Sequence, residues 1–302
     1  MKVLFSLRHP FGLRNFEPVV REFIRRGHTV RLSFLTGDKS VTSGRHSLLS
    51  DAVAGVSWAT LPPRKRESSF TQARDLRLLN DALRYRLPMY DQAEKLRARA
   101  DRRLSADWAR VPRLSLWRWS VANRLASDIL TALDASLPPS QTIVDDVQEQ
   151  EPDLILMSPL VDFGSEQVDY VKAGRLLGIP SALAVNSWDN LTNKGRVRVQ
   201  PDRVLVWNEV QRDEAVRYHR CRRERVVVTG APIFDRWFDR RPSGAAAEFK
   251  QRAGLDPARP YVLYLCSSPF VAEHEIAFVE RWLAAVHGDG PDLAEVGVLI
   301  RP

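Results

Sequence analysis

The sequence predicts an α/β protein whose first domain is a doubly wound parallel sheet with a helical insertion, followed by the incomplete start of a second such domain. Short apolar runs recur along the chain, and stretches with helical spacing of apolar residues separate them. The first 35 residues read as strand, loop, helix and strand, which is a βαβ unit with parallel strands. A length of 302 residues is enough for about two domains.

The opening βαβ unit occupies residues 2–35. An apolar run at 2–9 ends in a loop with proline and glycine, and apolar residues then recur every three or four positions from Phe16 to Ile24. This spacing predicts an amphipathic helix, which Asn15 can cap and Gly27 can end. A second strand is expected at 29–35 and a third at 56–61.

The rest of the first domain, to residue 238, contains a helical insertion and four further strands. Leucines and other apolar residues at helical spacing predict two or three long helices over about 64–140, broken at Pro88 and Pro112. Strand-like apolar runs return at 153–157, 181–185, 203–207 and 225–229, with helical stretches near 165–177 and 209–220.

The remaining residues predict a linker and part of a second domain. The interval 239–259 is polar and is interrupted by proline and glycine residues. It is followed by a predicted strand at 261–266, a helix near 271–286 and a strand at 296–300. Such a domain needs about 100 residues, so 260–302 is expected to be its truncated beginning. We therefore expect a C-terminally truncated piece without turnover of its own.

The net charge of +8 comes from one part of the sequence. Between Arg64 and Arg118 there are 15 basic and 7 acidic residues, a surplus of 8, and three tryptophans lie in or beside this interval. Arginine with tryptophan on amphipathic helices suits an anionic membrane surface, so peripheral membrane contact through 64–118 is one expectation. The alternative is a solvated helical face whose tryptophans pack inward.

Composition and motifs exclude several other classes. No apolar run reaches about 18 residues, which predicts a cytoplasmic location, at the inner face of the membrane if that contact exists. Two cysteines cannot make a disulfide framework, and the six histidines lack metal-ligand spacing. No Walker A, GxGxxG or GxSxG motif occurs, and no nucleic-acid motif accompanies the basic residues. We expect neither cofactor, nor metal, nor nucleic-acid partner.

Loops after the strands of a parallel sheet are where ligands bind, and two of them stand out in the first domain. The loop at 8–15 offers His9 as an acid or base, Gly12 for close backbone approach and Arg14 as a cation. The loop at 186–195 combines polar groups with one tryptophan: its candidate residues are Asn186, Trp188, Asp189, Asn190 and Lys194. Capped turns with solvated charges are the structural alternative for both loops.

Two further loops carry weaker signals. Gly230 follows the run 225–229 and precedes Pro232, a pattern that a structural elbow explains equally well. Ser267 and Ser268 follow the run 261–266, where hydroxyl and N–H groups can receive phosphate oxygens or simply cap a helix.

Several of these segments together resemble known enzymes. The loop and helix from Phe11 to Gly27, with the following His28–Thr29–Val30, resemble the opening of GT-B glycosyltransferases. The stretches 202–208 and 226–235 look like the end of the first domain in CDP-glycerol glycerophosphotransferases and UDP-N-acetylglucosamine 2-epimerases. The stretch 259–264 and the final 299–302 resemble the first two strands of their second, Rossmann-like domain.

The resemblance implies a transferase that moves a sugar or polyol phosphate from a UDP-, CDP- or GDP-linked donor to a cell-surface polysaccharide or lipid-linked acceptor. It assigns the acceptor side to Gly12, Arg14, Asn186, Trp188, Asn190 and Lys194. It assigns the donor side to Gly230, Ser267, Ser268 and Arg301. Many GT-B enzymes place a catalytic histidine where this chain has Leu13, so His9 and Asp189 are the candidate catalytic groups. A sugar-nucleotide epimerase and a non-catalytic binding module are the alternatives.

Overall fold

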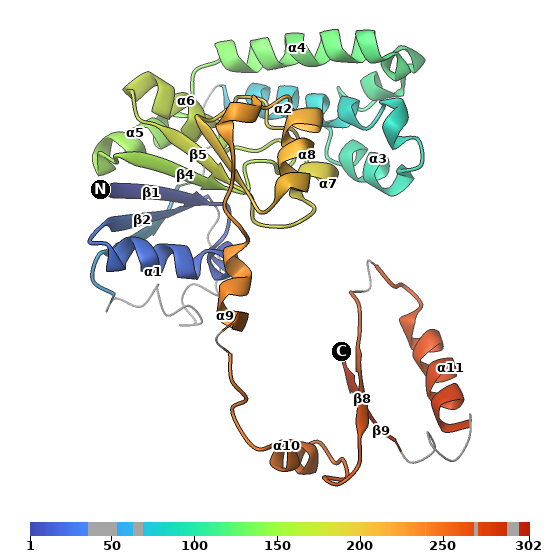
Figure 1. Ribbon diagram of the computed structural model, residues 1–302. Helices are drawn as coiled ribbons and strands as arrows, with labels where there is room; N and C mark the ends of the chain where they lie inside the picture. Colours follow the sequence, from blue (N-terminus) through green and yellow to red (C-terminus); the bar gives the residue numbers. More distant parts are fainter. Residues whose placement is uncertain (36–52, 63–68, 239, 269–270, 289–295) are drawn as a thin grey trace. The chain divides into compact units, whose positions relative to one another are not determined.

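The computed structural model describes residues 1–35, 53–62, 69–238, 240–268, 271–288 and 296–302 (Figure 1). These residues form two compact units, Met1–Phe238 and Asp239–Pro302.

The first unit is built on a seven-stranded parallel sheet, which confirms the predicted fold class. The strand order is β3-β2-β1-β4-β5-β6-β7, so the chain winds outward in both directions from β1 and β4. The strands are β1 (Lys2–Leu7), β2 (Thr29–Phe34), β3 (Val56–Thr60), β4 (Leu154–Ser158), β5 (Ser181–Ala184), β6 (Arg203–Val206) and β7 (Val226–Val228).

Both faces of the sheet are buried, which explains why its strands are continuous apolar runs. Within β1, Val3 and Phe5 pack with Val20 of helix α1 (Glu17–Arg25), whereas Leu4 belongs to the core on the opposite face. That opposite core is covered by α5 (Gln141–Gln150), α6 (Val168–Leu177) and α8 (Glu209–His219). Figure 1 shows α1 separated from α5 and α6 by the strands.

The predicted helical insertion contains three longer helices and three single turns. The helices are α2 (Phe70–Arg84), α3 (Glu94–Asp101) and α4 (Ser120–Ser136), and the 3₁₀ turns are η4 (Pro88–Tyr90), η5 (Val111–Arg113) and η6 (Ser115–Arg118). Helix α4 lies along α2 at the outer edge of the unit (Figure 1). Among the described residues, no helix is both long enough and apolar enough to cross a membrane.

Helix α4 packs with its polar side inward, although apolar residues at helical spacing are expected to face the core. Ser127 Oγ donates to Asn80 Oδ1 of α2 at 2.8 Å, and Asn123 Nδ2 donates to the Leu83 carbonyl at 2.7 Å. The apolar positions Val121 and Leu125 are instead 80% and 61% exposed. The spacing correctly predicted a helix with one apolar face, but tertiary hydrogen bonds decided which face is buried.

Of the basic interval 64–118, residues 64–68 lie outside the described part of the chain, and the described residues 69–118 are not one surface patch either. Arg77 and Arg84 of α2 lie in the interior, with 2% and 1% of their surface exposed. Arg77 pairs with Asp134 at 2.9 Å and with Asp169 at 2.6 Å. Two of the counted cations therefore serve the packing of the helices, because a buried guanidinium must have anionic or carbonyl partners.

The second unit contains α10 (Ala246–Arg252), β8 (Tyr261–Leu265), α11 (Glu275–Gly288) and β9 (Gly297–Arg301). Strands β8 and β9 pair in parallel, with Leu265 opposite Arg301. The interval 239–259, predicted as a linker, includes the helix α10. In the first unit the short helices α7 (Asn190–Asn193) and α9 (Asp235–Phe238) and the 3₁₀ turns η1 (Pro10–Asn15), η7 (Arg223–Arg225) and η8 (Pro232–Phe234) complete the elements.

A buried histidine on α8 makes the stability of the first unit depend on pH. His219 Nδ1 accepts the Val197 N–H at 3.0 Å, and its Nε2 donates to the Leu191 carbonyl at 2.7 Å. Burial and the nearby Arg84 guanidinium hold the pKa of His219 well below its ordinary value of 6.5. Below pH 6.5 the unfolded state binds a proton at this histidine that the folded state does not bind. The contribution of His219 to the free energy of unfolding is therefore fully present above pH 6.5 and is lost as the pH falls.

We expect the free energy of unfolding to fall by up to about 1.4 kcal/mol per pH unit below the ordinary histidine range. Urea denaturation at several pH values from 7.5 to 5, in buffers of constant ionic strength, measures this slope. His219→Gln removes the titrating group and should flatten the profile in this window. An equal slope in both proteins would assign the pH dependence to other groups.

Candidate functional site

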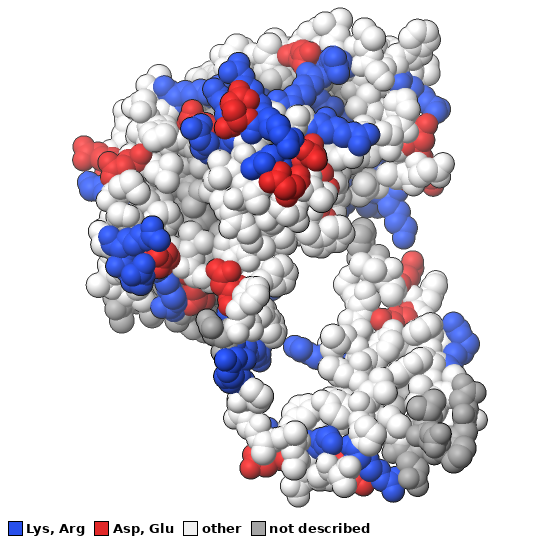
Figure 2. Space-filling view, in the orientation of Figure 1, with Lys and Arg blue, Asp and Glu red and all other residues white. Residues whose placement is uncertain are grey.

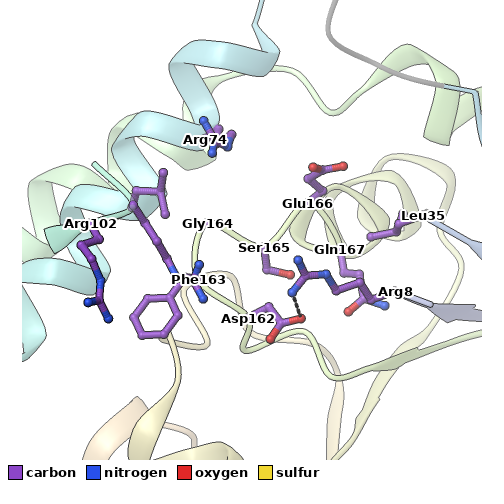
Figure 3. Close-up of a pocket in the computed structure, with 12 residues that line it drawn as sticks. Arg8, Leu35, Arg74, Arg102, Asp162, Phe163, Gly164, Ser165, Glu166 and Gln167 are labelled. Carbon is purple, nitrogen blue, oxygen red and sulfur yellow. Dashed lines mark hydrogen bonds and ion pairs between the residues drawn. The ribbon is translucent and has the colours of Figure 1, made fainter. Parts of the chain in front are cut away.

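The topological switch point of the sheet carries a cavity. Strand β1 pairs with β2 on one side and with β4 on the other, and parallel sheets bind ligands beyond the carboxyl ends of such strands. A cavity of about 410 Å³ lies there (Figure 3). Its lining joins Arg8 after β1, Leu35 after β2 and residues 162–167 after β4 to three arginines of the helical segment, Arg74, Arg102 and Arg103.

The loop after β4 is held firmly in place. Gln167 Nε2 donates to the carbonyls of Ser6 at 2.9 Å and Ser158 at 3.0 Å, which fixes the loop to the ends of β1 and β4. The Gly164 N–H donates to Asp81 Oδ2 of α2 at 2.9 Å. Groups placed on this loop are therefore preorganised, which binding and catalytic sites require.

Asp162 connects three loops, two of which line the cavity. Its Oδ2 accepts from Arg8 Nη1 of the first loop at 2.7 Å (Figure 3). Its Oδ1 lies 3.9 Å from Lys194 Nζ of the loop 186–195, outside the cavity lining. Only 15% of its side chain is exposed. Sequence reasoning missed this residue, although the polar run 162–167 follows a predicted strand of the same sheet and gave the same signal as the other loops.

The cavity has an excess of positive charge. Four arginines and two carboxylates, Asp162 and Glu166, line it. Arg74, Arg102 and Arg103 form no ion pair with any carboxylate in the described part of the chain, and Asp162 is already paired with Arg8. Arg103 lies over the ring of Phe163, 5.0 Å from its centroid. Burial and the neighbouring cations Arg99 and Arg8 lower the pKa of Arg103. Cations this close together repel one another until an anion binds between them.

The first loop uses its candidate groups differently from the expectation. His9 Nδ1 accepts the Phe11 N–H at 3.1 Å, so its side chain caps the 3₁₀ turn η1. The Arg14 guanidinium stacks on the Phe11 ring at 3.8 Å. Leu13 is 1% exposed and belongs to the core beside α1, so this position cannot supply a catalytic group.

The second loop is joined to the first but is largely occupied by its own hydrogen bonds. Asn15 Nδ2 donates to the Asn186 carbonyl at 3.1 Å, which brings the two loops together and replaces the expected helix cap. Asp189 accepts from Ser187 Oγ at 2.6 Å and from Asn193 Nδ2 at 2.5 Å. Each oxygen of its carboxylate accepts one hydrogen bond from within the loop, so the carboxylate orders the loop.

Two other residues of this loop differ sharply in exposure. Asn190 is 3% exposed and its Oδ1 accepts the Asn186 N–H at 3.2 Å, so its side chain supports the loop from within. Trp188 is 74% exposed and keeps the open aromatic face expected of a stacking platform.

The predicted donor residues lie in both units. Gly230 follows β7 with φ of 86° and lines an apolar cavity next to α1. Ser267, Ser268 and Arg301 lie at the carboxyl edge of the β8–β9 pair, as expected. The Ser267 N–H, however, donates to both Glu275 carboxylate oxygens, at 2.8 and 2.9 Å, so it is not free for a phosphate. Among the described residues no three metal-ligating side chains gather at one point.

Gly195 is needed where the second loop meets α2. A Cβ there would lie 2.7 Å from Asp81 Oδ2, and Asp81 cannot retreat because Gly164 and Arg196 N–H groups hold it. We expect Gly195→Ala to lower the free energy of unfolding by about 1–3 kcal/mol, as overpacking does. Gly12→Ala is the control, since its Cβ would meet only Leu7 at 3.7 Å. Equal urea midpoints for the two variants would contradict this packing.

The fold is similar to that of solved sugar-nucleotide proteins. The Anabaena protein HepE, solved with UDP and glucose, is 13% identical with a TM-score of 0.50, over 99% of this chain and 60% of that one. UDP-GlcNAc 2-epimerase from Neisseria meningitidis, solved with UDP-GlcNAc, is 12% identical with a TM-score of 0.50, over 100% of this chain and 65% of that one. This chain thus spans less than two thirds of either structure.

At the level of sequence, no protein-family model matches the chain, and neither does any curated protein. The structural likeness confirms the α/β fold of GT-B type that the sequence resemblance implied.

Proposed function

We propose that the protein is a GT-B-like transferase that uses a nucleotide-activated donor and an acceptor with an anionic group. The observation that supports this most is the arginine-lined cavity at the switch point of the sheet. Lipid-linked acceptors carry a phosphate or diphosphate, and cell-surface polymers often carry phosphate or carboxylate. Three arginines without a carboxylate partner among the described residues match that chemistry, because guanidinium binds both groups through paired hydrogen bonds.

The geometry suggests how the acceptor is positioned. Its anionic group binds between Arg74, Arg102 and Arg103, and its hydroxyl points toward Asp162 on the rigid loop after β4. Among the described residues, the one partner of Asp162 Oδ1 is Lys194 Nζ at 3.9 Å, so this oxygen can accept the hydroxyl proton. Holding both reactants in place accounts for much of the rate enhancement in such transfers.

In the transfer of a sugar, the acceptor oxygen forms a bond to the anomeric carbon while the bond from that carbon to the donor diphosphate breaks. The hydroxyl proton passes to Asp162, and the electron pair leaves with the diphosphate. Stabilising this leaving group needs cations and donors. Within the second unit, Arg301 and Ser268 at the β8–β9 edge are the candidates for binding the donor.

The finer resemblance to CDP-glycerol glycerophosphotransferases makes polyol phosphate transfer the second version of this proposal, with attack at phosphorus instead of carbon. A sugar-nucleotide epimerase needs no second substrate, so it leaves the arginines of the switch-point cavity unexplained. The cavity therefore favours a transferase over an epimerase.

A thermal-shift screen of the protein against UDP-, CDP- and GDP-linked sugars and polyols tests the proposal. One donor class should raise the melting temperature, because a ligand at 100 times its Kd stabilises the folded state by about 2.7 kcal/mol. NMR of the recovered ligand then distinguishes inversion of a sugar carbon, which would indicate an epimerase, from an unchanged donor that awaits its acceptor. Absence of any shift across the three classes would contradict nucleotide-sugar use.

A further inference from the structure

Helix α4 exposes a continuous apolar face. Its residues Val121, Leu125, Ile129 and Leu133 are spaced by four and are 80%, 61%, 51% and 48% exposed; we call them the α4 stripe. Trp119, immediately before the helix, is 75% exposed. Single exposed apolar residues are ordinary, but a row of this length on one face indicates an interaction surface.

Buried polar contacts hold α4 in the orientation in which its apolar face points outward. Its inward face hydrogen-bonds with α2 through Asn123 and Ser127, and Asp134 pairs with the buried Arg77. Turning the stripe inward would break these bonds and leave Arg77 with Asp169 of α6 as its one anionic partner among the described residues. The helix is therefore fixed with its apolar face outward.

An arginine-lined pocket adjoins the N-terminal end of the stripe. The pocket measures about 370 Å³ and includes Ser120 and Arg124 of α4. Its cations are Arg84, Arg124, Arg196, Arg217 and Arg220, and its lining contains no aspartate or glutamate; we call it the α4 pocket. Figure 2 shows Lys and Arg side chains, with Asp and Glu side chains among them, over the region where Figure 1 places α8.

The arginines of this pocket differ in how many of their donors have a hydrogen-bond or ion-pair partner. Arg84 donates to backbone carbonyls and Arg220 pairs with Asp128. Arg196 donates one hydrogen bond to Ser127 Oγ, and its Nε has no partner in the described part of the chain. Burial and the neighbouring cations Arg84 and Arg220 lower the pKa of Arg196 to about 10. An anion in the pocket would relieve this crowding.

We propose that the α4 stripe docks on an anionic membrane surface, with Trp119 at the interface and a lipid phosphate in the α4 pocket. Apolar side chains next to a cationic pocket match the layering of a bilayer, where acyl chains lie behind phosphate groups. A second copy of the chain fits less well, because twofold symmetry would bring the same arginines of both copies together. This surface lies mostly beyond the interval 64–118 expected from the sequence.

Sedimentation with vesicles tests the proposal. At low salt the protein should sediment with vesicles of 70% phosphatidylcholine and 30% phosphatidylglycerol and stay in solution with pure phosphatidylcholine. Raising the salt to 0.5 M should release it, because screening shortens the reach of the charges. Equal sedimentation with both vesicle types, or none with either, would overturn the proposal.

Matched variants locate the contact. Leu125→Gln with Ile129→Gln should lower the partition coefficient at least about tenfold, whereas Val210→Gln, at a residue 66% exposed on α8, should leave it unchanged. Arg124→Gln with Arg217→Gln should lower it about 25-fold, about fivefold per cation removed. All these side chains are exposed, and unchanged urea midpoints verify the fold.

Two further measurements distinguish a membrane from the other possible occupants of this surface, which are a free phosphate ion and a second copy of the chain. Inorganic phosphate at 5 mM should not release the protein at constant ionic strength, since the stripe contributes binding that a free anion cannot replace; full release would overturn the docking of α4. Sedimentation velocity in the absence of lipid should show a monomer. A dimer that Leu125→Gln with Ile129→Gln dissociates would assign the stripe to a second copy and overturn the proposal.

Discussion

Arg77→Ala should lower the free energy of unfolding by about 3–5 kcal/mol, the usual result of breaking a buried ion pair from one side. Arg77 is 2% exposed and bonds Asp134 of α4, Asp169 of α6 and the Ser165 carbonyl of the site loop. Its removal leaves two carboxylates buried, one of which keeps only Lys172 as a partner. Urea denaturation monitored by circular dichroism measures the loss.

A surface pair provides the matched control. Arg21 pairs with Glu17 on α1 at 2.6 Å, as short as the pair of Arg77 with Asp169, but the Arg21 side chain is 52% exposed. Arg21→Ala should therefore change stability by less than about 1 kcal/mol. Similar losses in the two variants would contradict the interior role of Arg77.

The pH dependence of the Arg77 effect has a definite sign. Burial alone would raise the pKa of Asp134, but the charge and hydrogen bonds of Arg77, with Lys172, bring it below its ordinary value. A depressed carboxylate pKa contributes stability above the unfolded pKa and loses it as the pH falls. The difference between wild type and Arg77→Ala should consequently shrink below about pH 4.

In a form of the protein that has donor-dependent turnover, Asp162→Asn should lower that turnover by about 100-fold or more, the usual contribution of a general base. Asparagine keeps the shape and can still accept from Arg8, so the fold and the affinity for the donor should change little. The pH profile of kcat identifies the role: the acidic limb of the wild-type profile should disappear in the variant. A base does this, and a merely structural aspartate does not.

Asp189→Asn is the companion variant. Its carboxylate accepts from Ser187 and Asn193 within its own loop, so this change should alter KM or loop order and leave the acidic limb in place. If Asp189→Asn removed the limb and Asp162→Asn kept it, the assignment of the base would be reversed in favour of the residue that the sequence pointed to.

The strands were predictable because both faces of a parallel sheet are buried, which makes each strand an apolar run between turn residues. The predicted strand 181–185 and the observed Ser181–Ala184 differ by one residue. The loops after β1 and β5 were predictable as neighbours, because parallel strands bring their carboxyl ends to one edge. Asn15 bonding Asn186 is the contact that joins them.

What the sequence could not provide depended on partners distant along the chain. Helical periodicity finds the apolar face of α4 but not the side on which the rest of the protein lies. Its polar face is buried because Arg77 and Asn80 of α2, about 50 residues earlier in the sequence, supply partners for Asp134 and Ser127. The role of Asp189 was likewise decided by the hydrogen bonds of Ser187 and Asn193, which local composition suggests but does not fix.

Isothermal titration calorimetry of an acceptor analogue tests the central claim most directly. The ligands are a glycosyl diphosphate with a short prenyl chain and the same sugar without the diphosphate, and the protein is titrated as wild type and as Arg102→Gln with Arg103→Gln. Lys95→Gln, an exposed cation of α3 outside the cavity, controls for net charge. We predict that the wild type prefers the diphosphate at least tenfold, as about 1.5 kcal/mol or more per charge-assisted hydrogen bond implies, and that only the cavity variant loses the preference. Equal affinity for both ligands, or a preference that survives the loss of Arg102 and Arg103, would contradict an anionic acceptor at the switch point.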